Sequence, residues 1–291
     1  MTPTPRQRAE RAGAGLPPLL LAAERVAAGV APGVHGRRRV GSGETFWQYR
    51  EYAAGDPAST IDWRRSARGD RLFVRQTEWE AAQCVWLWRD ASPSMAWRSS
   101  ETPPLKRERA EVLLLALASL LIRGGERVAL FGTGARPSAD RNTLPRLAAL
   151  LDGSSGEAAD LPPPRPVARH AQTVFVGDFL TNPEATLARM RTFAGQGVRG
   201  HLIQVLDPAE WELPYRGRVR FEGTEDEGAW LAPRAEGLRP AYRARIAEHT
   251  EALRAAARRV GWGFTRHRTD RPATAALLTV YHALSAARGR A

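Results

Sequence analysis

The 291-residue chain has little of what would place it in a membrane or an oxidising compartment. Its single cysteine, Cys84, excludes an internal disulfide, and a chain of this length without bridges is typical of a reducing compartment. The longest nearly apolar run, 112–122, is shorter than the roughly 20 residues of a transmembrane helix. The apolar stretch 16–23 is interrupted by prolines and has no small-residue cleavage site after it. We therefore expect a cytoplasmic protein without a signal peptide or a membrane span.

Lysine is nearly absent, because Lys106 is the only lysine among the 43 Lys and Arg residues. This preference for arginine is typical of a GC-rich genome. The formal net charge of +12 would suit a polyanionic partner, but basic and acidic residues are spread evenly along the chain. Nucleic-acid recognition needs a concentrated basic patch or stripe, so we expect no nucleic-acid partner.

The sequence also lacks the motifs of common nucleotide-dependent and hydrolytic enzymes. No Gly-x-x-x-x-Gly-Lys run leads to Lys106, no Gly-x-Gly-x-x-Gly follows an expected strand, and no Gly-x-Ser-x-Gly occurs. The six histidines are scattered, without a His-x-x-x-His pair or a cysteine partner. These absences argue against the commonest enzyme classes, and we assign no catalytic residue.

Hydrophobic periodicity divides the chain into an irregular N-terminal segment, residues 1–82, and an alternating α/β domain, residues 83–291. Short apolar runs predict strands and longer amphipathic runs predict helices. The predicted strands are 84–88, 127–131, 173–176, 201–206 and 263–267, and the predicted helices are 105–123, 142–151, one from about 183, 242–260 and 274–284. Between them lie a loop and a hairpin-like region, 152–170 and 218–230. Because parallel neighbours need a crossover, this alternation predicts a Rossmann-like three-layer fold.

Acidic residues follow three of these strands, namely Asp90, Asp178 and Asp207. Ligands of such sheets bind at the carboxyl ends of the strands. Asp90 begins an Asp-x-Ser-x-Ser turn, so its carboxylate and the hydroxyls of Ser92 and Ser94 can point toward one ion. Magnesium prefers oxygen ligands, and these three residues with Asp178 form a candidate metal site. The alternative is structural, with Asp90 and Ser92 capping the following turn.

An enzyme function is the second hypothesis for the same residues. Asp90 ends the first strand of the domain, where an aspartyl nucleophile of phosphotransfer chemistry would stand. The common form of that chemistry has a second aspartate two residues further on, and Ser92 occupies that place. The alternative function is therefore a magnesium-dependent phosphoester hydrolase that uses Asp90 and Asp178.

Aromatic and charged residues alternate between residues 41 and 68. A structural interpretation pairs Asp56 and Asp62 with Arg50 and Arg64, because a semi-buried arginine is costly unless it is matched. In this interpretation Trp63 buries one face against the sheet. The other interpretation is a docking or ligand site. The residues concerned in either case are Arg50, Tyr52, Gly55, Asp56, Asp62, Trp63 and Arg64.

Together these segments resemble the bacterial domain of unknown function family 58. The similarity spans about residues 30 to 285, and its best-matching pieces are Tyr49–Tyr52, Gly55-Asp56, Ile61–Arg64, Asp90–Met95, Asp207–Glu210, Tyr242 and Gly261-Trp262. The resemblance implies a von Willebrand factor type A-like fold for residues 83–291. It also implies a protein-interaction adaptor without enzyme activity, which acts with a MoxR-type AAA+ ATPase in the maturation or assembly of an unknown client protein.

Two features depart from the family pattern. Many members carry a pair of transmembrane helices before the glycine-rich motif, and no such span precedes Gly41, so the chain resembles a soluble subgroup. In von Willebrand factor type A domains a threonine from a separate loop also binds the metal. The resemblance implies Thr133 or Thr143, although neither lies in a matching motif. We therefore expect weak magnesium binding, completed by water and by an acidic residue of a partner.

Overall fold

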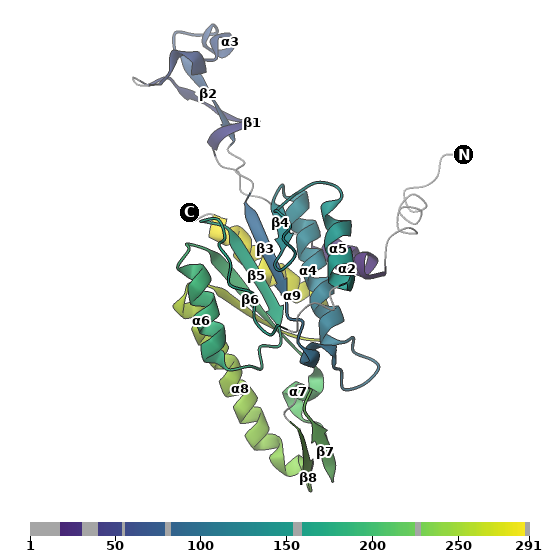
Figure 1. Ribbon diagram of the computed structural model, residues 1–291. Coiled ribbons are helices and arrows are strands. Elements are labelled where there is room, and N and C mark those ends of the chain that lie inside the picture. Colours follow the sequence, from purple (N-terminus) through teal and green to yellow (C-terminus); the bar gives the residue numbers. More distant parts are fainter. Residues whose placement is uncertain are drawn as a thin grey trace, which may run out of the picture. The chain divides into compact units, whose positions relative to one another are not determined.

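The computed structural model describes residues 18–30, 40–53, 56–78, 83–153, 159–224 and 228–288 (Figure 1). The chain divides into two compact units. The sheet unit comprises residues 1–33 and 83–291, and the hairpin unit comprises residues 34–82. The expected N-terminal segment 1–82 is therefore not one piece, because helix α2 (Pro18–Val30) packs against helices of the sheet unit.

A five-stranded parallel sheet forms the centre of the sheet unit, in the strand order β4-β3-β5-β6-β9. Its strands are β3 (Cys84–Arg89), β4 (Arg127–Leu130), β5 (Gln172–Gly177), β6 (Arg199–Leu206) and β9 (Gly263–Arg268). Because all neighbours are parallel, the connections between successive strands contain helices. The inner strands β3, β5 and β6 are almost wholly buried, which explains their continuous apolar runs.

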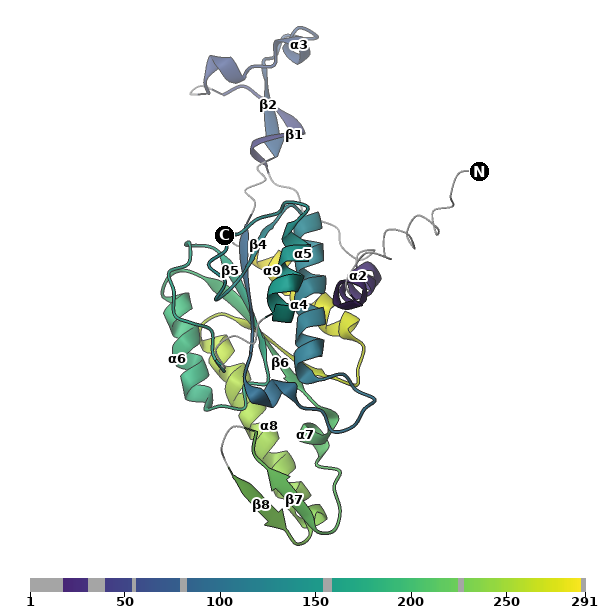
Figure 2. The ribbon, with the colours of Figure 1, turned by 45° about the vertical axis from the view of Figure 1, so that its right-hand side comes forward.

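Helices cover both faces of this sheet (Figure 1, Figure 2). One face carries α4 (Lys106–Arg123), α5 (Thr143–Gly153) and α9 (Ala273–Arg288). The other carries α6 (Pro183–Ala194) and α8 (Ala235–Arg259). These three layers confirm the predicted Rossmann-like α/β architecture. Within the described ranges, no helix is both long and apolar enough to cross a membrane.

Helix α4 lies between the sheet and α2, so its run 113–121 is buried on all sides. Helix α2 is not predicted from the sequence, because prolines stand at its start. Pro18 is in fact its first residue, where the missing N–H would have no helical partner. The hydroxyl of Ser119 on α4 donates to the carboxylate of Glu24 on α2 (2.7 Å), which also pairs with Arg123.

Aromatic side chains fill the layer between the sheet and helices α6 and α8. The ring of Phe175 on β5 lies at its centre, and its centroid is between 5.2 and 6.0 Å from the rings of Trp88, Phe131, Phe193 and Trp262. Most of these pairs are edge-to-face, the arrangement that aromatic quadrupoles favour. This packing makes the sheet a rigid support for the residues at its strand ends.

Short elements surround the carboxyl ends of the strands. The 3-10 turn η3 (Pro93–Ala96) follows β3, and α7 (Pro208–Glu212) follows β6. The antiparallel pair β7 (Val219–Glu222) and β8 (Ala229–Ala232) then leads into α8, in the region where a hairpin is expected. These short elements extend the sheet unit beyond the carboxyl ends of its strands.

The sequence predicts an irregular segment here, but the hairpin unit contains regular strands. Strand β1 (Val40–Glu51) pairs in antiparallel fashion with β2 (Phe73–Glu78). The connection holds the 3-10 turn η2 (Ala58–Thr60) and the single helical turn α3 (Trp63–Ser66). The register shifts within 41–48, so the two-residue alternation that identifies a strand is broken.

Candidate functional site

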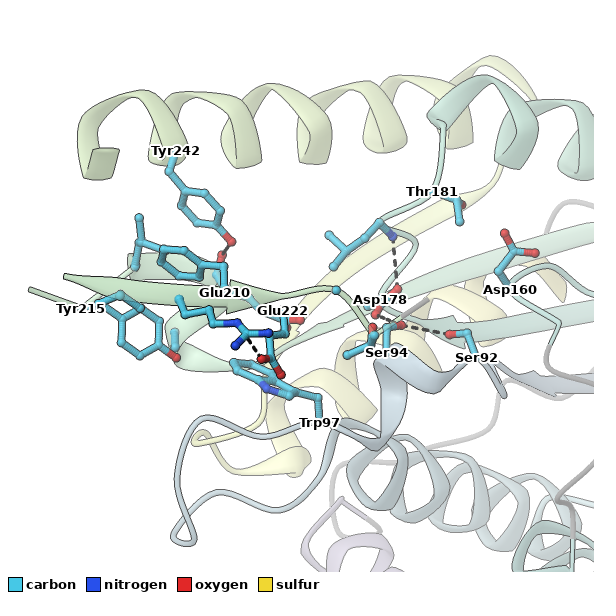
Figure 3. A pocket seen from close by; sticks show the side chains of 18 residues that line it. Ser92, Ser94, Trp97, Asp160, Asp178, Thr181, Glu210, Tyr215, Glu222 and Tyr242 are labelled. Atoms are coloured by element: carbon cyan, nitrogen blue, oxygen red, sulfur yellow. Dashed lines mark hydrogen bonds and ion pairs between the residues drawn. The ribbon is translucent and has the colours of Figure 1, made fainter. Parts of the chain in front are cut away.

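The Asp-x-Ser-x-Ser turn after β3 meets the end of β5 at the carboxyl edge of the sheet (Figure 3). Ser94 Oγ donates to Asp178 Oδ2 (2.6 Å) and lies 3.0 Å from Ser92 Oγ. The backbone N–H of Ser92 donates to Asp90 Oδ1 (2.9 Å), which is the local contact of the capping alternative. Hydrogen bonds therefore join all four residues of the candidate metal site.

Lys106, at the start of α4, also reaches this site, and sequence analysis did not anticipate it. Its Nζ donates to Asp178 Oδ2 (2.8 Å) and pairs with Glu210, and its side chain is 0% exposed. Burial alone would lower the pKa of Lys106, but the two carboxylates outweigh it and the pKa is raised above its ordinary value. The ammonium therefore stays charged at neutral pH.

The carboxylate of Glu210 has a second role in starting helix α7. Asp207 is the N-cap of α7, because its side chain accepts from the N–H of Ala209 (2.7 Å). Glu210 Oε2 accepts from the N–H of Asp207 (2.8 Å) and completes a capping box. Asp207 is thus a structural cap that also accepts from the N–H of Ser99 (3.1 Å), and Glu210 links α7 to Lys106.

The corner after β5 holds the Asp178 carboxylate in place. Phe179 has a left-handed φ of 48°, which is strained for a non-glycine residue. Its backbone oxygen lies 2.7 Å from His249 Nε2, and the backbone oxygen of Asp178 accepts from Gln204 Nε2 (3.1 Å). Asp178 Oδ1 accepts from the N–H of Leu180 (3.2 Å). Contacts from α8 and β6 therefore stabilise a backbone conformation that fixes both carboxylate oxygens.

Asp90 is the most enclosed of the predicted ligands, with 1% of its surface exposed. Burial, reinforced by the charge of Asp178, raises the pKa of Asp90 to about 7. A Cβ on Gly177 would lie 2.7 Å from Asp90 Oδ2, so the carboxylate rests directly on the backbone of β5. A pocket beside this site, described below, is not lined by Asp90. Because a nucleophile must reach its substrate, this position argues against Asp90 as the nucleophile of a hydrolase.

These residues do not suit a divalent cation. Magnesium lies about 2.1 Å from its ligands, so an ion bound to Asp178 Oδ2 would lie within about 5 Å of the Lys106 ammonium. At an effective dielectric constant of about 20, the repulsion would be on the order of 7 kcal/mol. Displacing the ammonium would instead leave it buried without a partner. Within the part of the chain that the structure describes, no three His, Cys, Asp or Glu side chains group as metal ligands.

The two candidate threonines have separate local environments. Thr133 Oγ1 donates to the backbone oxygen of Leu130 (2.9 Å) in the turn after β4. Thr143 is fully buried at the start of α5. Neither lines the pocket that Ser92 and Ser94 line.

Ser94, Asp178, Lys106 and Glu210 form a cluster that we call the ionic cluster. A pocket of about 630 Å³ is lined by Ser94, Asp178 and Glu210 of this cluster (Figure 3). Its polar lining includes Ser92, Ser94, Asp160, Asp178, Glu210 and Glu222, and its aromatic and aliphatic walls include Trp97, Leu180, Leu213, Tyr215, Phe221 and Tyr242. The hydroxyl of Tyr242 donates to the backbone oxygen of Glu210 (2.6 Å), which ties α8 to α7. Burial, with the charge of Glu210, raises the pKa of Tyr242 to about 12.

In the hairpin unit, the expected pairing of Arg50 with Asp56 is present and bidentate, at 2.6 and 2.7 Å. The hydrogen bond from Arg50 is the largest cause that lowers the pKa of Asp56 to about 2, and a second comes from the N–H of Ala53. The hydroxyl of Tyr52 donates to the backbone oxygen of Asp56 (2.9 Å). These contacts close the loop that follows β1.

The expected pairing of Asp62 with Arg64 is absent from this motif. Asp62 does not pair with Arg64, because its carboxylate accepts from the N–H of Arg65 (2.9 Å) as the N-cap of α3. Arg64 is exposed, and Trp63 is 64% exposed. A helix of one turn points these neighbouring side chains outward. Gly55 lies outside the described residues.

Two residues of the site were missed by sequence reasoning. The sequence indicates no site role for Lys106, which follows no phosphate-loop motif, or for Glu210, which lies in a segment that resembles the family. Composition is the one sequence feature that points to Lys106. A single lysine among 43 basic residues indicates a position where the shape of an arginine side chain does not fit. Glu210 carried no local signal beyond its place three residues after an N-cap aspartate.

The protein is a three-layer α/β protein, with an ionic cluster and a pocket at the carboxyl edge of its sheet. The chain belongs to the family described as Protein of unknown function DUF58, which matches residues 48–252. No curated protein matches the chain.

Two solved structures are similar to the chain at low identity. The conserved hypothetical protein BatB from Bacteroides thetaiotaomicron is 16% identical, with a TM-score of 0.42, and the match covers 72% of this chain and 100% of that one. An aerotolerance-related membrane protein from Bacteroides fragilis is 14% identical, with a TM-score of 0.38, over 70% of this chain and 100% of that one.

Proposed function

We propose that this chain is a non-enzymatic, cytoplasmic adaptor with a von Willebrand factor type A-like sheet unit. It binds a partner protein at the carboxyl edge of the sheet and acts with a MoxR-type AAA+ ATPase in the maturation or assembly of other proteins. The observation that carries this proposal is the pocket beside the ionic cluster. Its aromatic walls suit an apolar side chain of a partner, and the charged residues Asp160 and Glu222 supply the polar surroundings usual for an interface.

Exposed apolar residues continue from the pocket wall onto the neighbouring surface. Leu180, which lines the pocket, is 41% exposed. Trp230 on β8 is 54% exposed and stacks on the wall residue Phe221, with ring centroids 6.2 Å apart. Tryptophan is enriched among the residues that carry most of the energy of protein interfaces. In the hairpin unit, the exposed Trp63 and Arg64 provide a second contact surface in this proposal.

The phosphoester hydrolase is the less favoured alternative. Its nucleophile would be Asp90, which is enclosed and lies outside the pocket lining. The second carboxylate, Asp178, already accepts hydrogen bonds from Ser94 and Lys106. Substrate would therefore have to displace these contacts before reaching either group.

The proposal predicts that Leu180→Arg weakens binding of a purified MoxR-type ATPase at least about tenfold, because it places a charge at the mouth of the apolar pocket. Leu278→Arg is the matched control, since Leu278 is a similarly exposed leucine on α9, at 37%. Binding is measured by biolayer interferometry, and thermal melting verifies that both variants are folded. Equal loss in the two variants, or no binding by the wild type, would contradict the proposal.

A phosphatase assay separates the two hypotheses. Hydrolysis of p-nitrophenyl phosphate with magnesium that disappears in Asp90→Asn would favour the hydrolase. The adaptor proposal expects the same background rate in wild type and variant.

A further inference from the structure

The only lysine of this chain occupies a position that its many arginines do not fill. Lys106 is 0% exposed. The other 42 of the 43 Lys and Arg residues are all arginines. A guanidinium is broad and planar, whereas an ammonium is a compact point charge with three donors. A compact cation is what a closely spaced set of oxygen acceptors requires.

Two carboxylates from separate parts of the fold bind the ammonium. Asp178 follows β5 and accepts from Nζ at 2.8 Å, and Glu210 on α7 forms the second ion pair. Ser94, from the turn after β3, donates to the same Asp178 oxygen. The positive charge of Lys106 therefore offsets the repulsion between the carboxylates of Asp178 and Glu210 at the carboxyl edge of the sheet.

We propose that the Lys106 ammonium is the resident cation of this site and takes the place of a divalent metal ion. The inference does not depend on the identity of a partner protein. It concerns how the carboxyl edge of the sheet is held together, and it makes the Asp-x-Ser-x-Ser turn independent of magnesium and manganese.

The first test uses the wild-type full chain, freed of metal with EDTA and titrated calorimetrically with magnesium and with manganese. We expect no saturable binding and the same melting temperature in millimolar magnesium as in EDTA. Saturable binding of either ion, with a rise in melting temperature that Asp178→Asn abolishes, would overturn the proposal.

The second test removes the ammonium with Lys106→Met, which keeps the length of the side chain but leaves Asp178 and Glu210 without their cation. We expect a melting temperature lower by on the order of 10 °C in EDTA, and partial recovery on adding magnesium or manganese. Arg107→Met is the matched control, because Arg107 is the next residue along and its side chain is 46% exposed. A Lys106→Met protein that responds to metal no more than this control would overturn the proposal.

A double variant keeps the test decisive if Lys106→Met does not fold. In Lys106→Met with Asp178→Asn, one buried negative charge is removed together with the ammonium, so we expect a folded protein that binds neither ion. Saturable binding of magnesium or manganese by this folded double variant would show that Asp178 is not part of the cation site and would overturn the proposal. None of these measurements uses the ATPase, so their outcome is separate from that of the adaptor proposal.

Discussion

Gly177 illustrates how a single residue controls the approach of two strand ends. A Cβ at this position would lie 2.7 Å from both Cβ and Oδ2 of Asp90, closer than such atoms approach in folded proteins. Any side chain here would push the Asp-x-Ser-x-Ser turn away from β5.

We therefore expect Gly177→Ala to lower the free energy of unfolding by about 2 kcal/mol, because the added methyl overpacks a rigid site. Urea denaturation measures the effect. Gly237→Ala is the matched control: Gly237 is a helical glycine with open space around its Cβ position, so the change should stabilise the protein by about 0.7 kcal/mol. A Gly177→Ala protein as stable as wild type would show that the turn moves without cost.

At the scale of elements, strands β6 and β9 each carry a buried histidine. Burial lowers the pKa of His201 to about 4, and burial together with the charge of Arg109 lowers that of His267 to about 4, despite Asp270. Both rings are therefore neutral in the folded protein near neutral pH, whereas they titrate at about 6.5 when unfolded. The unfolded chain binds more protons as the pH falls below about 6.5, so this contribution to stability decreases from there to about pH 4.

We predict that His201→Gln flattens the pH dependence of the free energy of unfolding between pH 6.5 and 4. The folded-state shift of His201 corresponds to a loss of up to about 3 kcal/mol across this range in the wild type, which a glutamine cannot contribute. Glutamine retains a polar group for Thr265, whose hydroxyl lies 2.8 Å from His201 Nε2. Denaturant midpoints measured through this range test the prediction, and parallel curves for the two proteins would refute it.

At the scale of the whole molecule, helix α2 precedes the hairpin unit in sequence but belongs to the sheet unit in space. It buries the apolar residues Leu20, Ala23, Ala27 and Val30. Helix α2 packs against α4, whose run 113–121 is buried throughout. The sheet unit is therefore completed by a helix that the family match over 48–252 does not include.

Removing one of these buried side chains should destabilise the sheet unit. We expect Leu20→Ala to cost about 3 kcal/mol, because Leu20 is 1% exposed and its loss leaves a cavity against α4. Ala28→Ser on the exposed side of α2 should stay within about 0.5 kcal/mol of wild type. Calorimetric unfolding of the full chain provides the comparison, and an unchanged transition in Leu20→Ala would show that α2 contributes nothing to the sheet unit.

The sequence by itself determined the sheet and the residues at its strand ends. Buried parallel strands are continuously apolar, so short apolar runs locate β3, β5 and β6, and the ends of these strands carry Asp90, Asp178 and Asp207. The bidentate pairing of Arg50 with Asp56 was also within reach, because the two residues are only six positions apart. Both features can be read from a short segment of the sequence.

Only the tertiary structure decided what the strand-end residues bind. The carboxylates of Asp178 and Glu210 are 72 and 104 residues from Lys106 in sequence, and no periodicity encodes their convergence. A cation site is defined by groups that folding brings together from distant segments, and its charge balance therefore cannot be read from one segment at a time.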